Sequence, residues 1–203
     1  MKKAITTLMG LGLLAALVTV GVTTSSAQDK KGGGKKGGIN LPPMIKITVD
    51  GYADGGVIPN KFTCAGSPTA PSPKITWSGA PANTAAYAVL LHDPDPVLGG
   101  SATNDVMHWM IFDIPGTATG LPEGVEKKAE LADGSKQLNG FAGAGYMGPC
   151  APPGHGAHHY TIEVWALSSK LDIPASSTRE QVMAAMNGKV LTKGVYIGMF
   201  EQK

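Results

Sequence analysis

Three histidines lie within five positions where a loop rich in glycine and proline meets an apolar run. They are His155, His158 and His159, in the stretch GYMGPCAPPGHGAHHYTIEVWAL at residues 145–167. A neutral imidazole can bind a metal or accept a proton, and a protonated imidazole can donate hydrogen bonds to an anion. The stretch is therefore compatible with a metal site, a catalytic site or an anion pocket.

Two carboxylates follow another apolar run, AAYAVLLH at residues 85–92, within the sequence DPDP. Pro94 and Pro96 fix the backbone φ angle and remove two hydrogen-bond donors, so Asp93 and Asp95 would hold set positions at the end of a strand. By itself the motif is more typical of a turn. Its carboxylates are nevertheless free to accept hydrogen bonds from histidine, tyrosine or backbone N–H groups.

A further histidine, His108, lies near the start of the apolar run at residues 106–114. Side chains alternate along a strand, so this histidine would share a face with Met110, Phe112 and Ile114.

The same alternation places His158 on the apolar face of its strand with Tyr160 and Ile162, and His159 on the other face. A single histidine on such a face is more often a core residue with a hydrogen-bond partner, since an unpaired one costs about 1–3 kcal/mol. Aspartates after one strand and histidines at the start of two others together favour a pocket at one end of a sheet.

Strand-like runs separated by turn residues recur along the chain. Besides those already named, they cover residues 44–49, 74–77 and 194–200. Long uninterrupted apolar runs are typical of central strands covered on both faces. One helix is expected after Ser177, because Ser177 and Glu180 fit a capping box. The pattern predicts a mostly β fold with few short helices.

The first 38 residues differ in composition from the rest. Residues 1–27 have the basic start, apolar stretch and small residues of a secretory signal peptide, and an uncleaved membrane anchor is the alternative. Residues 28–38 form a Gly/Lys-rich linker, and residues 39–203 form the folded domain. We therefore expect an exported protein, periplasmic or secreted, with no stable membrane span after signal cleavage.

The charge is unevenly distributed. The chain has a net charge of +2, but six of its 17 basic residues and one of its 15 acidic residues lie in the first 38 positions. The domain is therefore slightly acidic, at about −3, which argues against a nucleic-acid partner.

The two cysteines, Cys64 and Cys150, are either disulfide-bonded or free. An even pair in an exported chain favours the bond. It would close a loop of about 86 residues, for which chain entropy gives about 4–5 kcal/mol.

Six stretches together resemble the phosphatidylethanolamine-binding proteins, in particular the bacterial branch named for its similarity to Raf kinase inhibitor protein (the YbhB/YbcL type). The resemblance spans about residues 45–200, and the order and rough spacing of the stretches also match. They are FTCAG (62–66), SPKITWSGAP (72–81), HDPDP (92–96), MHWMIFDIP (107–115), LPEG (121–124) and GYMGPCAPPGHGAHHY (145–160).

The resemblance implies a β-sandwich-like fold with a large central antiparallel sheet and a small anion pocket at one end. Family ligands include phosphate, phosphorylated head groups, acetate and cacodylate. The resemblance also implies that Asp93 orients a histidine, that Trp77 packs near the pocket floor and that Cys64 pairs with Cys150. By position, the ligand-binding residues would be Asp93, Asp95, His108, Gly148, Pro149, His158 and Tyr160.

The sequence departs from the family pattern in two places. It reads DPDPV where the family usually reads DPDAP, so the rim after Asp95 could differ in shape. His159 replaces the arginine of the family's H-R-Y motif, on the strand face away from His158, and we expect the pocket to survive that change.

These observations favour a non-enzymatic binding protein for a small anion or phosphorylated head group, and the resemblance implies a protein partner whose enzyme activity it could modulate. The alternative is a hydrolase that uses serine and histidine, or a metal held by a carboxylate with His108 and His158. The chain has neither a G-x-S-x-G nor an H-E-x-x-H motif. A structural envelope protein is a third reading. No cofactor is expected.

Overall fold

The computed structural model describes residues 42–100 and 103–203. The predicted signal peptide (1–27) and linker (28–38) lie outside the described residues, so these boundaries stay predictions. Among the described residues, no helix combines the length and the hydrophobicity that crossing a membrane requires. Strands predominate and the helices are few and short, which confirms the mostly β fold class.

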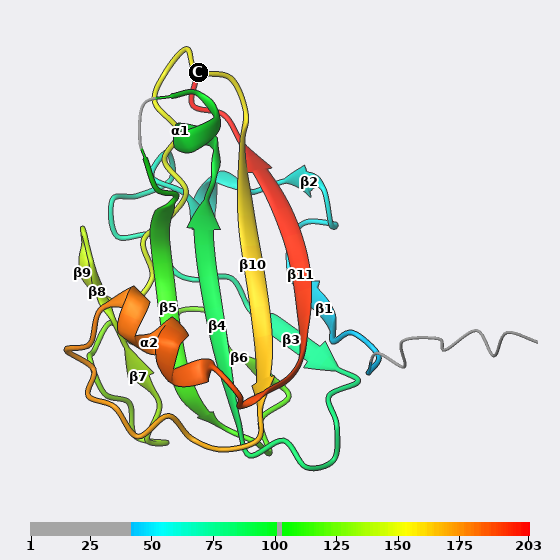
Figure 1. Ribbon diagram of the computed structural model, residues 1–203. Helices are drawn as coiled ribbons and strands as arrows, with labels where there is room; N and C mark the ends of the chain where they lie inside the picture. Colours follow the sequence, from blue (N-terminus) through cyan, green and yellow to red (C-terminus); the bar gives the residue numbers. More distant parts are fainter. Residues whose placement is uncertain (1–41, 101–102) are drawn as a thin grey trace, which may run out of the picture. The chain divides into compact units, whose positions relative to one another are not determined.

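A six-stranded sheet in the order β2-β11-β10-β4-β5-β7 forms the centre of the fold (Figure 1). All neighbouring strands are antiparallel except β2, which runs parallel to β11 at one edge. The sheet consists of β2 (Gly56–Val57), β4 (Ala86–Asp93), β5 (Val106–Pro115), β7 (Lys136–Gln137), β10 (His158–Leu167) and β11 (Val190–Phe200). The four long strands coincide with predicted apolar runs, whereas the two-residue edge strands were not predicted.

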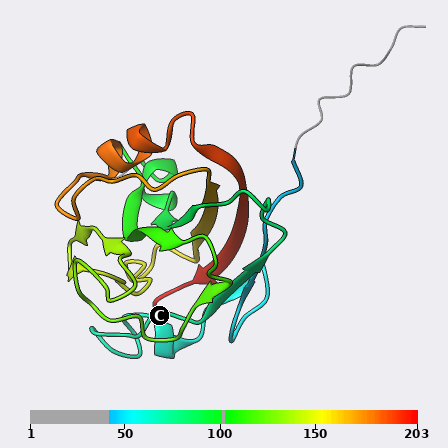
Figure 2. The same ribbon diagram turned by 90° about the horizontal axis from the view of Figure 1, so that it is seen from below.

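A smaller antiparallel sheet covers one face of the large one, which gives the expected sandwich (Figure 2). It contains β1 (Lys46–Val49), β3 (Ile75–Ser78) and β6 (Gly120–Leu121). The main core fills the space between the sheets and includes Ile47, Val89 and Ile162. Outside it lie a 3-10 turn, η1 (Asn60–Phe62), and a hairpin of β8 (Asn139–Gly140) and β9 (Gly143–Ala144).

Helix α2 (Arg179–Met186) covers the other face of the large sheet (Figure 1). Its Val182 and Met186 are buried in a second core with Leu90 and Phe112. Burying an aliphatic side chain of this size contributes about 1.5–3 kcal/mol, so this apolar stripe is what holds the helix on the sheet.

The predicted start of α2 is wrong by one residue. The N-cap is Thr178, whose side chain accepts a hydrogen bond from the Gln181 backbone, while the Gln181 side chain accepts one from the Thr178 N–H. The N–H of Ser177 is already bonded to the Pro174 carbonyl in the preceding turn. A capping box therefore forms, but with the next threonine and glutamine in place of Ser177 and Glu180.

Strand β4 is buried on both faces, as its continuous apolar run predicted. Val89 and Leu91 point into the core between the sheets, and Ala88 and Leu90 point toward α2. A strand in this position has no solvent face, so alternation of apolar and polar residues is lost. Only at its end, at Asp93, does a charged side chain appear.

A β-bulge in β5 changes the direction of His108. Leu91 pairs with Trp109 but His92 pairs with Met107, which leaves His108 as the extra residue. Such an extra residue interrupts the alternation of faces. The ring of His108 accordingly lies against Tyr160, with ring centroids 5.1 Å apart.

The predicted companions of His108 are therefore wrong. Met110 and Phe112 belong to the core under α2, on the other side of the sheet. Ile114 lies in the core between the sheets because β5 has a second irregularity next to Asp113, whose φ is +57°.

The disulfide between Cys64 and Cys150 is present, which confirms the favoured state of the two cysteines. It joins the segment after η1 to the loop that precedes β10. The Cys64 N–H also donates to the Pro149 carbonyl at 3.0 Å, so backbone and side chain hold the same two segments together.

Replacing both cysteines by serine should lower the free energy of unfolding by about 2–5 kcal/mol, because the bond closes a loop with a sequence separation of 86. Urea denaturation of the oxidised protein and the double variant measures the difference. Adding reductant to wild type should reproduce it, and equal stability of all three samples would contradict the prediction.

Candidate ligand-binding site at one end of the large sheet

The predicted site residues come from three strands that meet at one end of the large sheet, at the top of Figure 1. Asp93 is the last residue of β4, and Asp95 is the first residue of the short helix α1 (Asp95–Leu98). His158 begins β10, and His108 lies at the bulge near the start of β5.

Helix α1 forms where a turn was predicted. Pro94 is its N-cap and Pro96 falls in its first turn. The N–H groups of a first helical turn have no partner within the helix, so proline costs little there. The DPDP motif thus fixes Asp95 immediately after the strand end.

Asp93 is a buried carboxylate that gathers hydrogen bonds from two segments. It is 3 % exposed. One oxygen lies 2.7 Å from Nδ1 of His158, and the other accepts the Asp95 N–H at 3.0 Å. The hydroxyl of Tyr160 is near enough for the charge of Asp93 to raise its pKa. As predicted, this aspartate orients a histidine.

Tyr160 connects Asp93 to the glycine- and proline-rich loop. Its side chain is fully buried, and its hydroxyl oxygen accepts the Cys150 N–H at 3.1 Å. Burial, followed by the negative charge of Asp93, raises the pKa of Tyr160 far above its usual value of 10.0. The phenol therefore stays protonated.

His108 is buried near the other ring that faces Tyr160, His158, and both histidines are almost fully shielded from solvent. His108 is 5 % exposed, and its Nδ1 lies 3.2 Å from the Met147 carbonyl oxygen. Burial lowers the pKa of His108, although the Met147 hydrogen bond and the negative charge of Asp93 partly oppose that effect. The ring is thus neutral at pH 7.

Asp95 is held by His159, the residue that replaces the family arginine. The His159 N–H donates to one carboxylate oxygen at 2.5 Å, and its Nδ1 lies 3.2 Å from both oxygens. Partial burial raises the pKa of Asp95, but the hydrogen bonds and charge of His159 lower it by more, so the net shift is downward. Asp95 is thus a charged group with a fixed direction.

Gly148 and Pro149 have packing roles. A Cβ on Gly148 would lie 2.9 Å from the Phe62 carbonyl oxygen and 3.1 Å from the Thr63 Cα. Only glycine therefore allows this close approach of the loop to η1. Pro149 contributes its carbonyl to the Cys64 N–H.

An open pocket of about 360 Å³ leads to the outer part of the site. Of the seven predicted ligand-binding residues, Asp95 and His158 line it. Its other lining residues are Leu98, Gly99, His155 and Ala157. The remaining five predicted residues lie behind this opening, where the burial of His108 and Tyr160 keeps them from solvent.

A family model described as phosphatidylethanolamine-binding protein matches residues 48–201. The chain belongs to the phosphatidylethanolamine-binding protein family.

Its relatives place it in the bacterial branch of that family. It is 35% identical over 160 residues to a UPF0098 protein of Aquifex aeolicus, covering 78% of this chain and 90% of the relative. A Mycobacterium tuberculosis protein named as a lipoprotein, LppC, is 31% identical over 206 residues, covering 91% and 95%. The crystal structure of Escherichia coli YbcL superposes with a TM-score of 0.70 at 28% identity, covering 79% of this chain and all of that one.

One expectation taken from the phosphatidylethanolamine-binding protein resemblance is wrong. Trp77 lies on β3 and packs against Tyr87, with ring centroids 5.1 Å apart. Tyr87 is at the beginning of β4, whereas the candidate site is at its end. At about 3.3 Å per residue, the two ends are roughly 20 Å apart, so Trp77 is no part of the pocket floor.

The structure changes the composition of the possible metal cluster. Ligand atoms of Asp93, Asp95 and His158 lie within 4.8 Å of one another. His108, which the sequence placed in this alternative, is not among them. In the described residues, no serine hydroxyl is hydrogen-bonded to a histidine. The arrangement thus resembles a metal or anion site more than a Ser/His catalytic pair.

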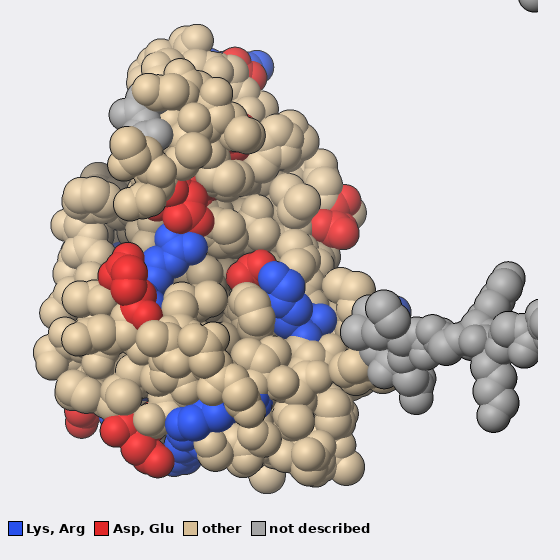
Figure 3. All heavy atoms as spheres, viewed as in Figure 1, with Lys and Arg blue, Asp and Glu red and all other residues tan. Residues whose placement is uncertain are grey.

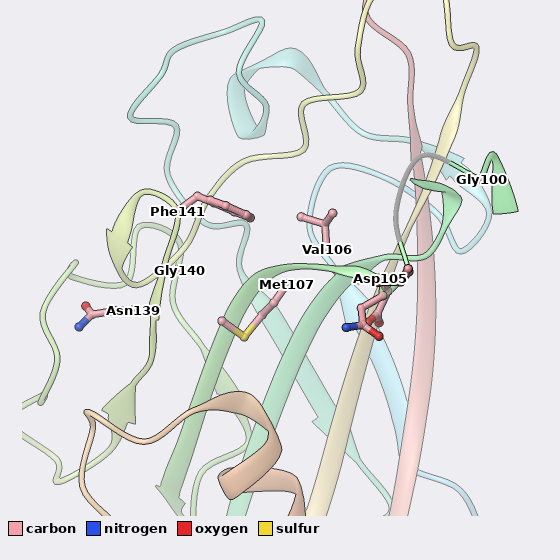
Figure 4. Close-up of a pocket in the computed structure, with 9 residues that line it drawn as sticks. Gly100, Asp105, Val106, Met107, Asn139, Gly140 and Phe141 are labelled. Carbon is pink, nitrogen blue, oxygen red and sulfur yellow. The ribbon is translucent and has the colours of Figure 1, made fainter. Parts of the chain in front are cut away.

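A larger open pocket, of about 810 Å³, lies between the start of β5 and the β8–β9 hairpin (Figure 4). Its one carboxylate, Asp105, forms a two-pronged ion pair with Arg179 at 2.5 and 2.9 Å. Because that charge is already neutralised and the lining holds no histidine, we place the candidate site at the Asp95 and His158 pocket.

Replacing Gly148 by alanine should lower the free energy of unfolding by about 1–3 kcal/mol, because the new methyl group meets backbone atoms that cannot move independently. Urea denaturation measures the effect. Gly140→Ala is the matched control, since its nearest neighbour would be 3.9 Å away. The prediction fails if the two variants are equally stable.

Proposed function

We propose that the protein is an exported, non-enzymatic binding protein whose pocket accepts a small anion or a phosphorylated head group. One observation carries the proposal: His158 lines the open pocket while its Nδ1 is held by the buried carboxylate of Asp93. The other ring nitrogen, Nε2, is thereby left for a ligand.

The proposal needs donors that an anion can reach. When His158 is protonated, Nε2–H becomes a donor and the carboxylate of Asp93 compensates the positive charge. Asp93 accepts a hydrogen bond on each oxygen, and Asp95 contacts His159, so these partners partly offset the negative charge that the two carboxylates bring to the pocket. His108 would become a further donor if His158 shifted to admit the ligand.

Export is supported by the N-terminal sequence and by the name of the LppC relative. We propose residues 1–27 as the signal peptide, residues 28–38 as the linker and residues 39–203 as the binding domain, located in the periplasm or outside the cell. On the face in Figure 3, lysine and arginine side chains lie beside acidic ones. A protein partner whose enzyme activity is modulated is the second part of the proposal.

Millimolar phosphate or phosphoethanolamine should raise the thermal unfolding midpoint of the protein, because a ligand that binds only the folded state stabilises it. A ligand at one hundred times its dissociation constant stabilises the folded state by about 2.7 kcal/mol. His158→Ala should abolish the ligand-induced increase.

His92→Gln is the control, since it removes an imidazole whose ring contacts Asp105 and does not line the pocket. The comparison is made between samples with and without ligand for each variant, so a change in basal stability does not affect it. An increase that persists in His158→Ala would rule out this pocket as the anion site.

Anion affinity should rise as the pH falls. Burial keeps the pKa of His108 below 6.5, so the ring is neutral at pH 8, and a nearby anion would favour its protonated form. Asp93, His158 and Tyr160 are the titratable groups that face it. Binding then takes up a proton, and a pKa increase of one unit corresponds to a gain in affinity of about tenfold.

Titration calorimetry with sulfate at pH 5.5 and pH 8 tests this, because the charge of sulfate is constant over that range. His108→Gln should reduce the difference between the two pH values. Equal affinities in wild type would show that the histidines are not donors to the anion.

A further inference from the structure

We propose that the mouth of the pocket is a binding site for a divalent transition-metal ion such as Zn²⁺, with His155, His158 and Asp95 as its protein ligands. All three residues line the same open pocket. The proposal goes beyond anion binding, because it uses the neutral form of His158 and a histidine that the anion site does not require.

His158 is oriented as a metal ligand. Its Nδ1 lies 2.7 Å from Asp93, which favours the tautomer with the proton on Nδ1 and leaves a lone pair on Nε2. Histidines that bind metals usually donate their other ring N–H to a carboxylate or carbonyl in this way. Asp93 is buried and holds Nδ1 of His158, so it orients the histidine, whereas Asp95 lines the open pocket and can reach a metal there.

Asp95 provides the carboxylate ligand. Its ligand atom lies within 4.8 Å of those of Asp93 and His158. The backbone N–H and ring of His159 fix its direction at 2.5 and 3.2 Å, which reduces the freedom that would be lost on binding a metal. Hydrogen-bonded carboxylates are common in metal sites for this reason.

His155, from the loop before β10, would complete the set by turning its ring inward, because the ligand atoms that already lie within 4.8 Å of one another belong to Asp93, Asp95 and His158. The ring centroid of His155 lies 5.9 Å from that of His158. Two imidazoles that share one metal at about 2.0–2.1 Å from each nitrogen have ring centroids roughly 5–6.5 Å apart. The flanking Gly154 and Gly156 both have a φ of +82°, with no atom near the position of a Cβ, so the loop has room to direct the ring inward.

Two imidazoles and one carboxylate form a donor set that suits zinc and its neighbours better than magnesium or calcium, which prefer oxygen ligands. The two cysteines do not compete for the metal, because they are joined in the disulfide. With three protein ligands, a fourth position stays open toward solvent, where water or an anion could bind.

The test uses the full-length secreted protein, purified without a histidine tag and treated with a chelator. Titration calorimetry at pH 7.5 should give one Zn²⁺ per chain and no binding of Mg²⁺. His155→Ala and Asp95→Asn should each weaken Zn²⁺ binding about tenfold or more. His92→Gln is the matched control and should bind Zn²⁺ as wild type does.

His155 is exposed, so the thermal midpoint of metal-free His155→Ala should equal that of wild type, which excludes misfolding as the cause of lost binding. The proposal is overturned if wild type fails to bind Zn²⁺, or if both variants bind it with wild-type affinity. Sulfate binding is measured separately at pH 5.5 on His155→Ala. Because the anion site does not require His155, sulfate binding by this variant tests the anion site alone. The anion proposal and the metal proposal can therefore fail independently.

Discussion

The hydrogen bonds to Asp93 are the constraint on which this end of the molecule depends. A carboxylate that is almost fully buried is costly unless its lone pairs are engaged. The donors come from His158 at the start of β10 and from the N–H of Asp95 in α1. Each donor is thereby fixed relative to the other. The site is thus organised around a group that the ligand itself does not need to touch.

The rest of the fold provides the rigidity that such an arrangement requires. Strand β4 is packed on both faces, and β10 pairs with it from Thr161–His92 onward, so the end of one strand and the beginning of the other are held in register. The loop between residues 148 and 150 is held by close glycine packing and by backbone hydrogen bonds to the segment after η1. Mobile segments could not hold donors from two different elements on one buried acceptor.

The sequence carries enough information for the long strands and for part of the site. Uninterrupted apolar runs mark β4, β5 and β10, and residue types at strand ends predict that the DPDP carboxylates accept hydrogen bonds from histidine, tyrosine or backbone N–H groups. That Asp93 is the one that orients a histidine was implied only by the family resemblance. The orientation of His108 could not be predicted, because a one-residue bulge depends on the register between two strands and leaves no local signal. The expectation that Trp77 packs near the pocket floor was wrong, because the position of this side chain depends on which end of β4 it packs against. The sequence shows His155 only as one of three closely spaced histidines. Its place on the wall of the pocket depends on how the loop before β10 folds.

The hydrogen bond from Cys150 to Tyr160 links covalent maturation to the formation of the binding site. Cys150 can hold its N–H against the phenol only when the loop is in place, and the disulfide with Cys64 anchors that loop. In a newly made chain with reduced thiols, the loop is held only by the packing of Gly148 and by the hydrogen bond from Cys64 to Pro149. Under the proposed function, oxidation of the cysteines would fix the loop beside the pocket, so the ligand affinity would reach its full value in an oxidising compartment.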